Sequence, residues 1–381
     1  MPTIGTTTRP AYVYDAETDT WIPVGTGPHT HTGFAISDVT GLQAALDAEL
    51  SLTNYNAGAK NFVVNGGMDF FQRGTTFTTS GAYCADRWLL TLEGGPSCTA
   101  TQVTSSLPTG LVNALRVQRN AGNATTGTMG ISQALETASS IPLQGRTITL
   151  SFWARAGANY STTNNTLSIR INSGTGTNQA ASAQFGGWTG YAESAPDVQI
   201  TTSWARYSGT FNVPSNATQI GVRIFSVLSG TAGAADFFEV TGVQLELGST
   251  PTAFSRAGGT IQGEHAACLY YFNRVIDYSA GGSNANQTIM VAQNFASTGG
   301  FGAFPYPKMR INPTVTFSSQ TDFIITGAAG NEIATTALEA RNIKVNSCEL
   351  RYTVASGLTT GNAAFMYTKT TLGRIDLSAE L

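Results

Sequence analysis

Short runs of alternating apolar and polar residues, separated by clusters of Gly, Asn, Ser and Pro, make up most of the chain after residue 60. Alternation with a period of two is typical of half-buried β-strands, and the clusters between the runs are typical of turns. The runs lie at 147–154, 166–171, 205–213, 219–227 and 237–247, and then at 268–276, 288–294, 314–318, 323–326, 347–354 and 364–368. The pattern predicts an all-β protein, with a sandwich of two antiparallel sheets over 61–257 and a smaller β domain over 258–381. Within the second domain, residues 332–343 are predicted to form a helix.

The first 60 residues follow a different pattern. Residues 1–28 are rich in Thr, Pro and Gly, and two short apolar runs at 11–14 and 19–24 can form a small hairpin. This segment holds too little apolar mass for a core of its own, so we expect an extended arm that attaches to a partner.

Residues 29–60 contain a predicted short helix with a capping box at Thr40 and Gln43. Its apolar stripe, at coiled-coil-like spacing, comprises Ile36, Val39, Leu42, Ala45, Leu46 and Leu50. A helix of this length is marginal alone in water. We therefore expect the stripe to pack against copies of itself in an oligomeric stalk, with docking as a single helix as the alternative.

The composition of the chain argues against several classes of function. Charged residues make up only 11% of the chain, and a net charge of -3 does not provide the positive charge that nucleic-acid binding requires. No apolar stretch approaches the roughly 20 residues of a membrane span. Residues 1–5 lack the features of a signal peptide, so we expect synthesis in a cytoplasm without export. The four Cys show no metal-type pairing and are expected to be small buried residues.

Six segments occur in an order that is typical of one group of proteins. Residues 65–75 (NGGMDFFQRGT) and 81–88 (GAYCADRW) begin the predicted sandwich, and residues 237–248 (FFEVTGVQLELG) end it. Residues 36–47 (ISDVTGLQAALD) precede it, and residues 267–272 (ACLYYF) and 307–315 (PKMRINPTV) follow it. Together they resemble bacteriophage tail fibres, in which a jelly roll similar to carbohydrate-binding modules lies between a linker and a C-terminal domain.

The resemblance implies a homotrimeric receptor-binding protein of the virion tail. Residues 1–28 would attach to the baseplate or to a proximal fibre protein, residues 29–60 would form a trimeric stalk, and the distal domains would bind host surface polysaccharide. A purely structural tail component that bridges subunits is the alternative. A polysaccharide depolymerase is a second alternative, but the chain is not expected to be an enzyme, because no pair of carboxylates is singled out for glycoside hydrolysis. The host, the receptor and the β domain that carries the receptor site are not readable from the sequence.

Candidate glycan-binding residues are aromatic side chains in Gly-rich stretches, because a flat ring stacks on the apolar face of a sugar. Trp188 and Tyr191 lie in such a stretch, at 185–191. Further candidates, in loops of similar composition after residue 257, are Tyr278, Asn284, Asn286, Phe301, Phe304 and Tyr306. Ordinary packing or subunit contact is the alternative for each of them.

His29 and His31 are the candidate metal ligands. Alternate residues of an extended segment face the same side, so three copies on a three-fold axis would present six imidazoles, a set that suits an octahedral transition metal. The resemblance implies iron at this axis, and two exposed histidines in a polar linker are the alternative. Asp69, Glu239 and Glu246 could hold a structural calcium, but too few acids cluster and calcium is not expected. Asp86 and Arg87 are expected to form internal ion pairs.

Overall fold

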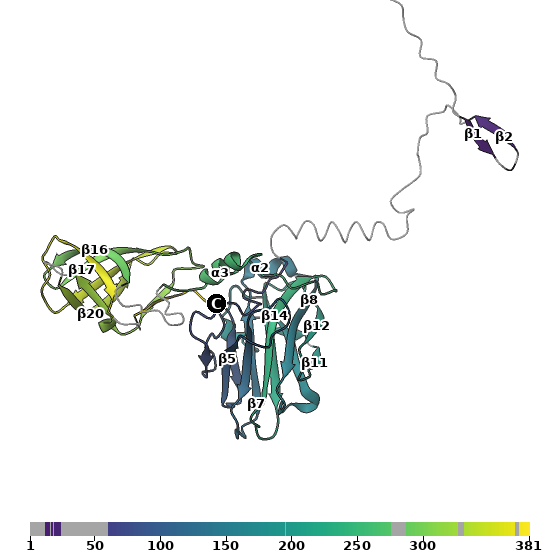
Figure 1. Ribbon diagram of the computed structural model, residues 1–381, viewed down its shortest axis with the longest axis horizontal. Coiled ribbons are helices and arrows are strands. Elements are labelled where there is room, and N and C mark those ends of the chain that lie inside the picture. Colours follow the sequence, from purple (N-terminus) through teal and green to yellow (C-terminus); the bar gives the residue numbers. More distant parts are fainter. Residues whose placement is uncertain are drawn as a thin grey trace, which may run out of the picture. The chain divides into compact units, whose positions relative to one another are not determined.

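The computed structural model describes residues 12–15, 17, 19–23, 60–194, 196–275, 287–326, 331–369 and 373–381. The chain forms two compact units, Met1–Ala57 and Gly58–Leu381. In the first unit, β1 (Tyr12–Asp15) pairs antiparallel with β2 (Thr20–Pro23), which confirms the predicted hairpin (Figure 1). The predicted stalk helix, with His29 and His31, lies outside the described residues.

Two six-stranded antiparallel sheets form the predicted sandwich, so the all-β fold class is confirmed (Figure 1). The sheet that we call the front sheet contains β10 (Ala192–Ser194), β9 (Thr166–Gly174), β13 (Gln219–Leu228), β7 (Gly127–Ala134) and β4 (Leu89–Glu93), with β11 (Asp197–Gln199) also paired to β9. The other sheet contains β12 (Ala205–Asn212), β8 (Thr147–Ala156), β14 (Phe237–Leu247), β6 (Ala114–Arg119), β5 (Cys98–Val103) and β3 (Thr76–Phe77). A short helix, α2 (Thr137–Ser140), follows β7.

Alternation along the strands explains how the sandwich forms. In β13, Ile220, Val222 and Ile224 are fully buried in the core between the sheets. Burying an aliphatic side chain of this size contributes roughly 1.5–3 kcal/mol relative to leaving it exposed. The residues between them must then face the other side of the front sheet. Trp88 is fully buried, and its indole N–H donates to the Asn65 carbonyl at 3.0 Å, whereas Trp153 and Trp204 are only half-buried.

A closed six-stranded barrel and a three-stranded sheet follow the sandwich. The barrel strands, in spatial order, are β16 (Thr288–Ala296), β17 (Gly299–Pro305), β21 (Ser347–Val354), β20 (Glu332–Arg341), β19 (Phe323–Thr326) and β22 (Ala363–Thr368). The small sheet contains β15 (Phe272–Arg274), β23 (Ile375–Ser378) and β18 (Thr314–Phe317). None of the helices in the described ranges is long and apolar enough to cross a membrane.

The prediction of a helix over 332–343 is wrong, because Glu332–Arg341 form the strand β20. Glu, Ala and Leu favour a helix locally, but β20 lies between β19 and β21 and its backbone hydrogen bonds complete the barrel. The helix of this region is α3 (Ile261–Leu269), where the Thr260 side chain accepts a hydrogen bond from the Gly263 amide as an N-cap.

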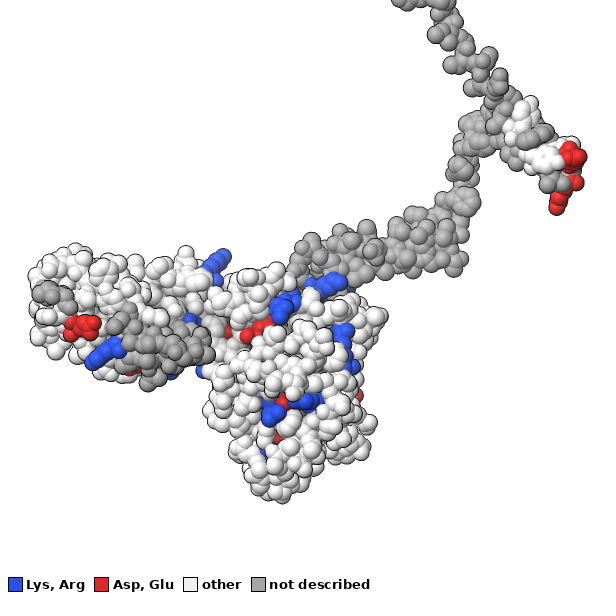
Figure 2. All heavy atoms as spheres, viewed as in Figure 1, with Lys and Arg blue, Asp and Glu red and all other residues white. Residues whose placement is uncertain are grey.

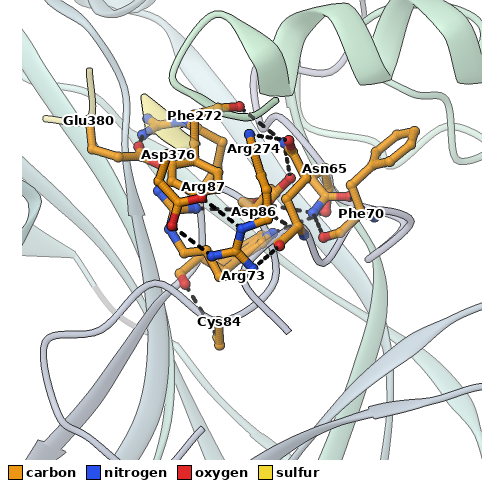
Figure 3. A network of polar contacts seen from close by, with 12 residues as sticks. Asn65, Phe70, Arg73, Cys84, Asp86, Arg87, Phe272, Arg274, Asp376 and Glu380 are labelled. Carbon is orange, nitrogen blue, oxygen red and sulfur yellow. Dashed lines mark hydrogen bonds and ion pairs between the residues drawn. The ribbon is translucent and has the colours of Figure 1, made fainter. Parts of the chain in front are cut away.

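A dense polar network joins the start of the sandwich to the last described residues (Figure 3). Arg73 and Arg87 both pair with Glu380, and their guanidinium groups lie 3.5 Å and 3.7 Å from the ring centroids of Phe272 and Tyr271. Asp86 forms an ion pair with Arg73 at 3.5 Å. Asp86 and Arg87 are thus both in internal ion pairs, as expected. Asp86 pairs with Arg73, and Arg87 pairs with Glu380.

The residues around Gly258 are closely packed. A Cβ atom on Gly258 would lie 2.0 Å from the Gly263 carbonyl carbon, so this position requires glycine. The buried Glu264 carboxylate accepts hydrogen bonds from the Gly258 amide, at 2.7 Å, and from the Asn65 amide. The predicted boundary near residue 258 stays a prediction, because both sides of it belong to the same compact unit.

All four cysteines are free and buried, as expected. Burial raises the pKa of the thiols of Cys84 and Cys98 to about 12 and that of Cys348 to about 11, and it also raises the pKa of Cys268. A thiol with such a raised pKa holds little thiolate at neutral pH and is correspondingly unreactive.

Candidate functional site

The outer face of the front sheet, which we call the front face, carries a row of polar side chains. Strand register places its residues in rows that cross the sheet. One row contains Leu89, Ser132, Arg223 and Arg170, and the next contains Thr91, Gly130, Phe225 and Ser168. Side chains from four strands, far apart in the sequence, therefore meet on one surface.

Two arginines lie flat on this face against aromatic rings. The Arg223 guanidinium is 4.0 Å from the ring centroid of Phe225 and 4.3 Å from that of Phe185, and Arg170 lies 5.2 Å from Phe225. Arg223 also pairs with Glu93 at 2.7 Å, and Arg170 pairs with Asp197 at 2.9 Å. Because each cation has a carboxylate partner, the face is polar without carrying a net charge of one sign.

A pocket of about 290 Å³ opens at one end of the front face. It is lined by Thr162, Thr163, Thr166, Ser168, Asp197, Val227, Leu228 and Ser229. Hydroxyl groups both donate and accept hydrogen bonds, and Asp197 adds a carboxylate acceptor. Val227, with 56% of its surface exposed, supplies an apolar contact surface. The pocket thus combines the two kinds of contact that a sugar ring makes, hydrogen bonds at its hydroxyls and apolar contact at its face.

Several buried polar atoms of the front sheet and of the segment that covers it have no hydrogen-bond partner within the protein. These are the Thr91 and Ser132 hydroxyls, the Asn172 side-chain oxygen, the Gln184 amide and the Arg223 Nε. Buried polar atoms are ordinarily satisfied by protein or by ordered water. These atoms lie beneath the surface, so we expect ordered water beside them.

The segment 181–191 forms a wall over the other end of the face. A Cβ atom on Gly221 would lie 2.2 Å from the Gln184 side-chain oxygen and 2.9 Å from the Trp188 ring, so this segment sits directly on the sheet. Trp188 is only 3% exposed, and its N–H donates to the Ala180 carbonyl at 3.0 Å. Its ring therefore supports the wall and presents no open face to a sugar.

Tyr191 is half-buried at the edge of the same wall, and its hydroxyl donates to Glu193 at 2.7 Å. Burial is the main cause of its raised pKa, with the Glu193 hydrogen bond second. Sequence reasoning named Trp188 and Tyr191 in this segment but not Phe185, which is half-buried beside Arg223. Its position before the two glycines of 186–187 was the available signal.

The remaining predicted residues that lie in the described ranges do not join this surface. Phe304 and Tyr306 are buried in the barrel, where the Tyr306 hydroxyl donates to the Lys344 carbonyl at 2.6 Å and burial raises its pKa to about 12. Phe301 is 37% exposed on the barrel surface, with its ring centroid 6.2 Å from that of Phe295. Tyr278, Asn284 and Asn286 lie outside the described residues.

The acids considered for calcium are held by separate partners. Asp69 pairs with Arg256 at 2.8 Å, and Glu239 pairs with Arg116 and Arg155 at 2.5 Å and 2.6 Å. Glu246 accepts from the Thr252 hydroxyl at 2.6 Å. Across the described part of the chain, no three His, Cys, Asp or Glu side chains gather as metal ligands would.

No family model and no curated protein matches the chain. Among solved structures, the enzymatically active domain of bacteriophage CBA120 tailspike protein 4 is 16% identical over 49% of this chain, with a TM-score of 0.32, and the match spans 21% of the tailspike chain. TmCBM61, solved with β-1,4-galactotriose, is 13% identical over 50% of this chain and 100% of its own, with a TM-score of 0.31. The CBM22-1 and GH10 modules of Clostridium thermocellum xylanase 10B, complexed with xylohexaose, are 15% identical over 49% of this chain and 29% of theirs, with a TM-score of 0.28. Similarity at this level gives no argument about function.

Proposed function

We propose that this chain is a non-catalytic glycan-binding protein and that the front face is its binding surface. The observation that carries the proposal is the pocket at one end of the front face, which is lined by hydroxyl groups and by the exposed side chain of Val227. A neutral or lightly charged saccharide fits this chemistry, because the arginines of the face are already paired with carboxylates. Charged side chains are also sparse on the side of the molecule seen in Figure 2.

Binding without catalysis is supported by the state of the carboxylates. A glycosidase needs two carboxyl groups that face each other across the scissile bond, one as an acid and one as a base or nucleophile. At the front face, Glu93 and Asp197 each form an ion pair with a different arginine. Each of these carboxylates is therefore bound by an arginine rather than paired with a second carboxylate.

More specifically, we propose that the protein is a homotrimeric tail fibre of a bacteriophage. It would attach through residues 1–28 and bind host surface polysaccharide. The six ordered segments described above support this proposal. Glycan sites are individually weak, and three sites in one trimer would raise the overall affinity through effective concentration.

A surface for contact between copies is available on the barrel. The neighbouring strands β22, β16 and β17 contain no Asp, Glu, Lys or Arg in their sequences, yet they expose Val291, Phe295, Phe301 and Phe365. An uncharged aromatic surface can meet its own copy without like-charge repulsion, and such surfaces are enriched in subunit contacts. This surface also favours the rival function, a structural tail component that only bridges subunits.

Substitution of Val227 tests the proposed binding surface. Val227→Arg places a long cation in the pocket, and Val112→Arg makes the same change at a valine that is 60% exposed in the loop before β6. Binding of the full chain to a saccharide panel that includes β-1,4-galactotriose and xylohexaose is measured by calorimetry. We expect binding by the wild type and the Val112 variant and a loss of about tenfold or more for Val227→Arg.

Two results would contradict the proposal. Equal affinity of Val227→Arg and the wild type would remove the front face as the site, and no binding across the panel would favour the structural rival. New reducing ends in the incubated polysaccharide would instead reveal a depolymerase.

A further inference from the structure

Residues 380 and 381, which follow β23, lie against the wall of the front face. The Leu381 carbonyl accepts hydrogen bonds from the Ala181 amide and from the Tyr83 hydroxyl, both at 3.2 Å. The Leu381 side chain packs against an apolar cluster that is separate from the main core and contains Leu89, Ala134, Ala181 and Trp188. Leu381 therefore contacts both the wall and the sheet beneath it.

Glu380 holds the same region from a second side. Its carboxylate pairs with Arg87, whose other guanidinium nitrogen donates to the Ala134 carbonyl at 2.7 Å (Figure 3). Ala134 ends β7 and lies opposite Gly221, the residue on which Trp188 and Gln184 sit. Both side chains of this ion pair are almost fully buried, so water does not compete for the contact.

We propose that Glu380 and Leu381 are positioning residues of the front face, which fix the segment 181–191 on the sheet and thereby set the place of Phe185 over Arg223. The effect on ligand binding rests on the function proposed above. It follows that residues 61–257 do not by themselves contain everything that shapes the binding surface.

Contacts that do not involve residues 380–381 make this a matter of position rather than of folding. The Trp188 N–H bond to Ala180 holds the turn, and the Asn172 amide of β9 donates to the Gln184 carbonyl at 2.9 Å. These bonds preserve the local turn structure when the support of Leu381 is removed. The segment would then be held less firmly on the sheet without unfolding.

Hydrogen exchange tests the positioning directly in the full chain. The variants are Leu381→Ala, which removes the apolar contact, and Glu380→Gln, which removes the charge opposite Arg87, with Val112→Ala as the matched aliphatic truncation in the loop before β6. We expect amide exchange in peptides from 181–191 to rise about tenfold in both test variants, with peptides from β8 and β14 unchanged. Unchanged exchange in 181–191 for both variants would overturn the proposal, and so would equal acceleration in all peptides, which indicates global destabilisation.

Affinity supplies the second readout. For the member of the saccharide panel that the wild type binds, we expect about tenfold weaker binding by Leu381→Ala and no change for Val112→Ala. Faster exchange with unchanged affinity would refute the link between residues 380–381 and binding. If the wild type binds no panel member, the function proposed above fails, while the exchange experiment still decides whether these residues position the wall.

Discussion

The buried ion pair between Asp236 and Arg119 provides a demanding test of how the sandwich is held together near the pocket. Both side chains are fully buried and lie 3.5 Å apart. Asp236 also accepts hydrogen bonds from the Ser161 amide at 2.9 Å and the Ser161 hydroxyl at 2.5 Å. Arg119 donates to the Ser229 carbonyl at 3.1 Å, next to the pocket. Asp236→Ala would leave the guanidinium buried with neutral acceptors only.

The expected magnitude follows from burial. Removing one partner of a buried ion pair typically costs about 3–5 kcal/mol, because the remaining charge stays desolvated without a counter-charge. A typical domain has a free energy of unfolding of about 5–15 kcal/mol, so the loss would be a large fraction of it. The Arg170–Asp197 pair is the internal comparison, because the Asp197 side chain is 49% exposed. Exposed pairs contribute about 1 kcal/mol or less, which sets the cost expected for Asp197→Ala.

Guanidinium unfolding followed by tryptophan fluorescence measures both variants. Four of the five tryptophans, Trp88, Trp153, Trp188 and Trp204, lie in the sandwich and report on it. We expect a much lower midpoint for Asp236→Ala and a nearly unchanged one for Asp197→Ala, with similar denaturant slopes. A loss below about 1 kcal/mol for Asp236→Ala, or equal losses for both variants, would refute the reasoning from burial.

Two further predictions concern pH and association. Burial raises the pKa of Asp86 from 3.8 to about 6, so the folded state favours the protonated acid. The resulting stabilisation is present below about pH 4 and is lost as the pH rises through 6, on the order of 3 kcal/mol in total. Unfolding midpoints measured from pH 4 to 8 should therefore fall more steeply in the wild type than in Asp86→Asn, and parallel curves would contradict this origin. Phe365→Asp should raise the dissociation concentration of the oligomer about tenfold in sedimentation experiments if the barrel surface joins copies, and unchanged association would exclude that surface.

The fold was predictable where strand alternation is strong. The run at 219–227 corresponds to β13, and the run at 237–247 matches β14. Prediction failed at 332–343, where local helix preference was overridden by the two neighbouring strands of the barrel. Such long-range pairing has no local signature.

The candidate site was predictable only in part. The glycine-rich stretch around Trp188 and Tyr191 was recognisable, but which of its rings is buried depends on the sheet beneath it. The pocket combines residues from 162–168, Asp197 and 227–229, which come together only through the pairing of β9 with β11 and β13. In β17, Phe301 and Phe304 lie on opposite sides of the strand, which composition alone could not resolve.

The burial of the four thiols has a practical consequence for following ligand binding in solution. A single cysteine introduced at the exposed Val227 position would be far more accessible to a maleimide or spin label than Cys84, Cys98, Cys268 or Cys348. The wild-type chain therefore serves directly as a background for site-specific labelling, without prior removal of its own cysteines. A fluorophore attached there would block the pocket, whereas one attached at position 185 would report movement of the segment 181–191 when a ligand binds.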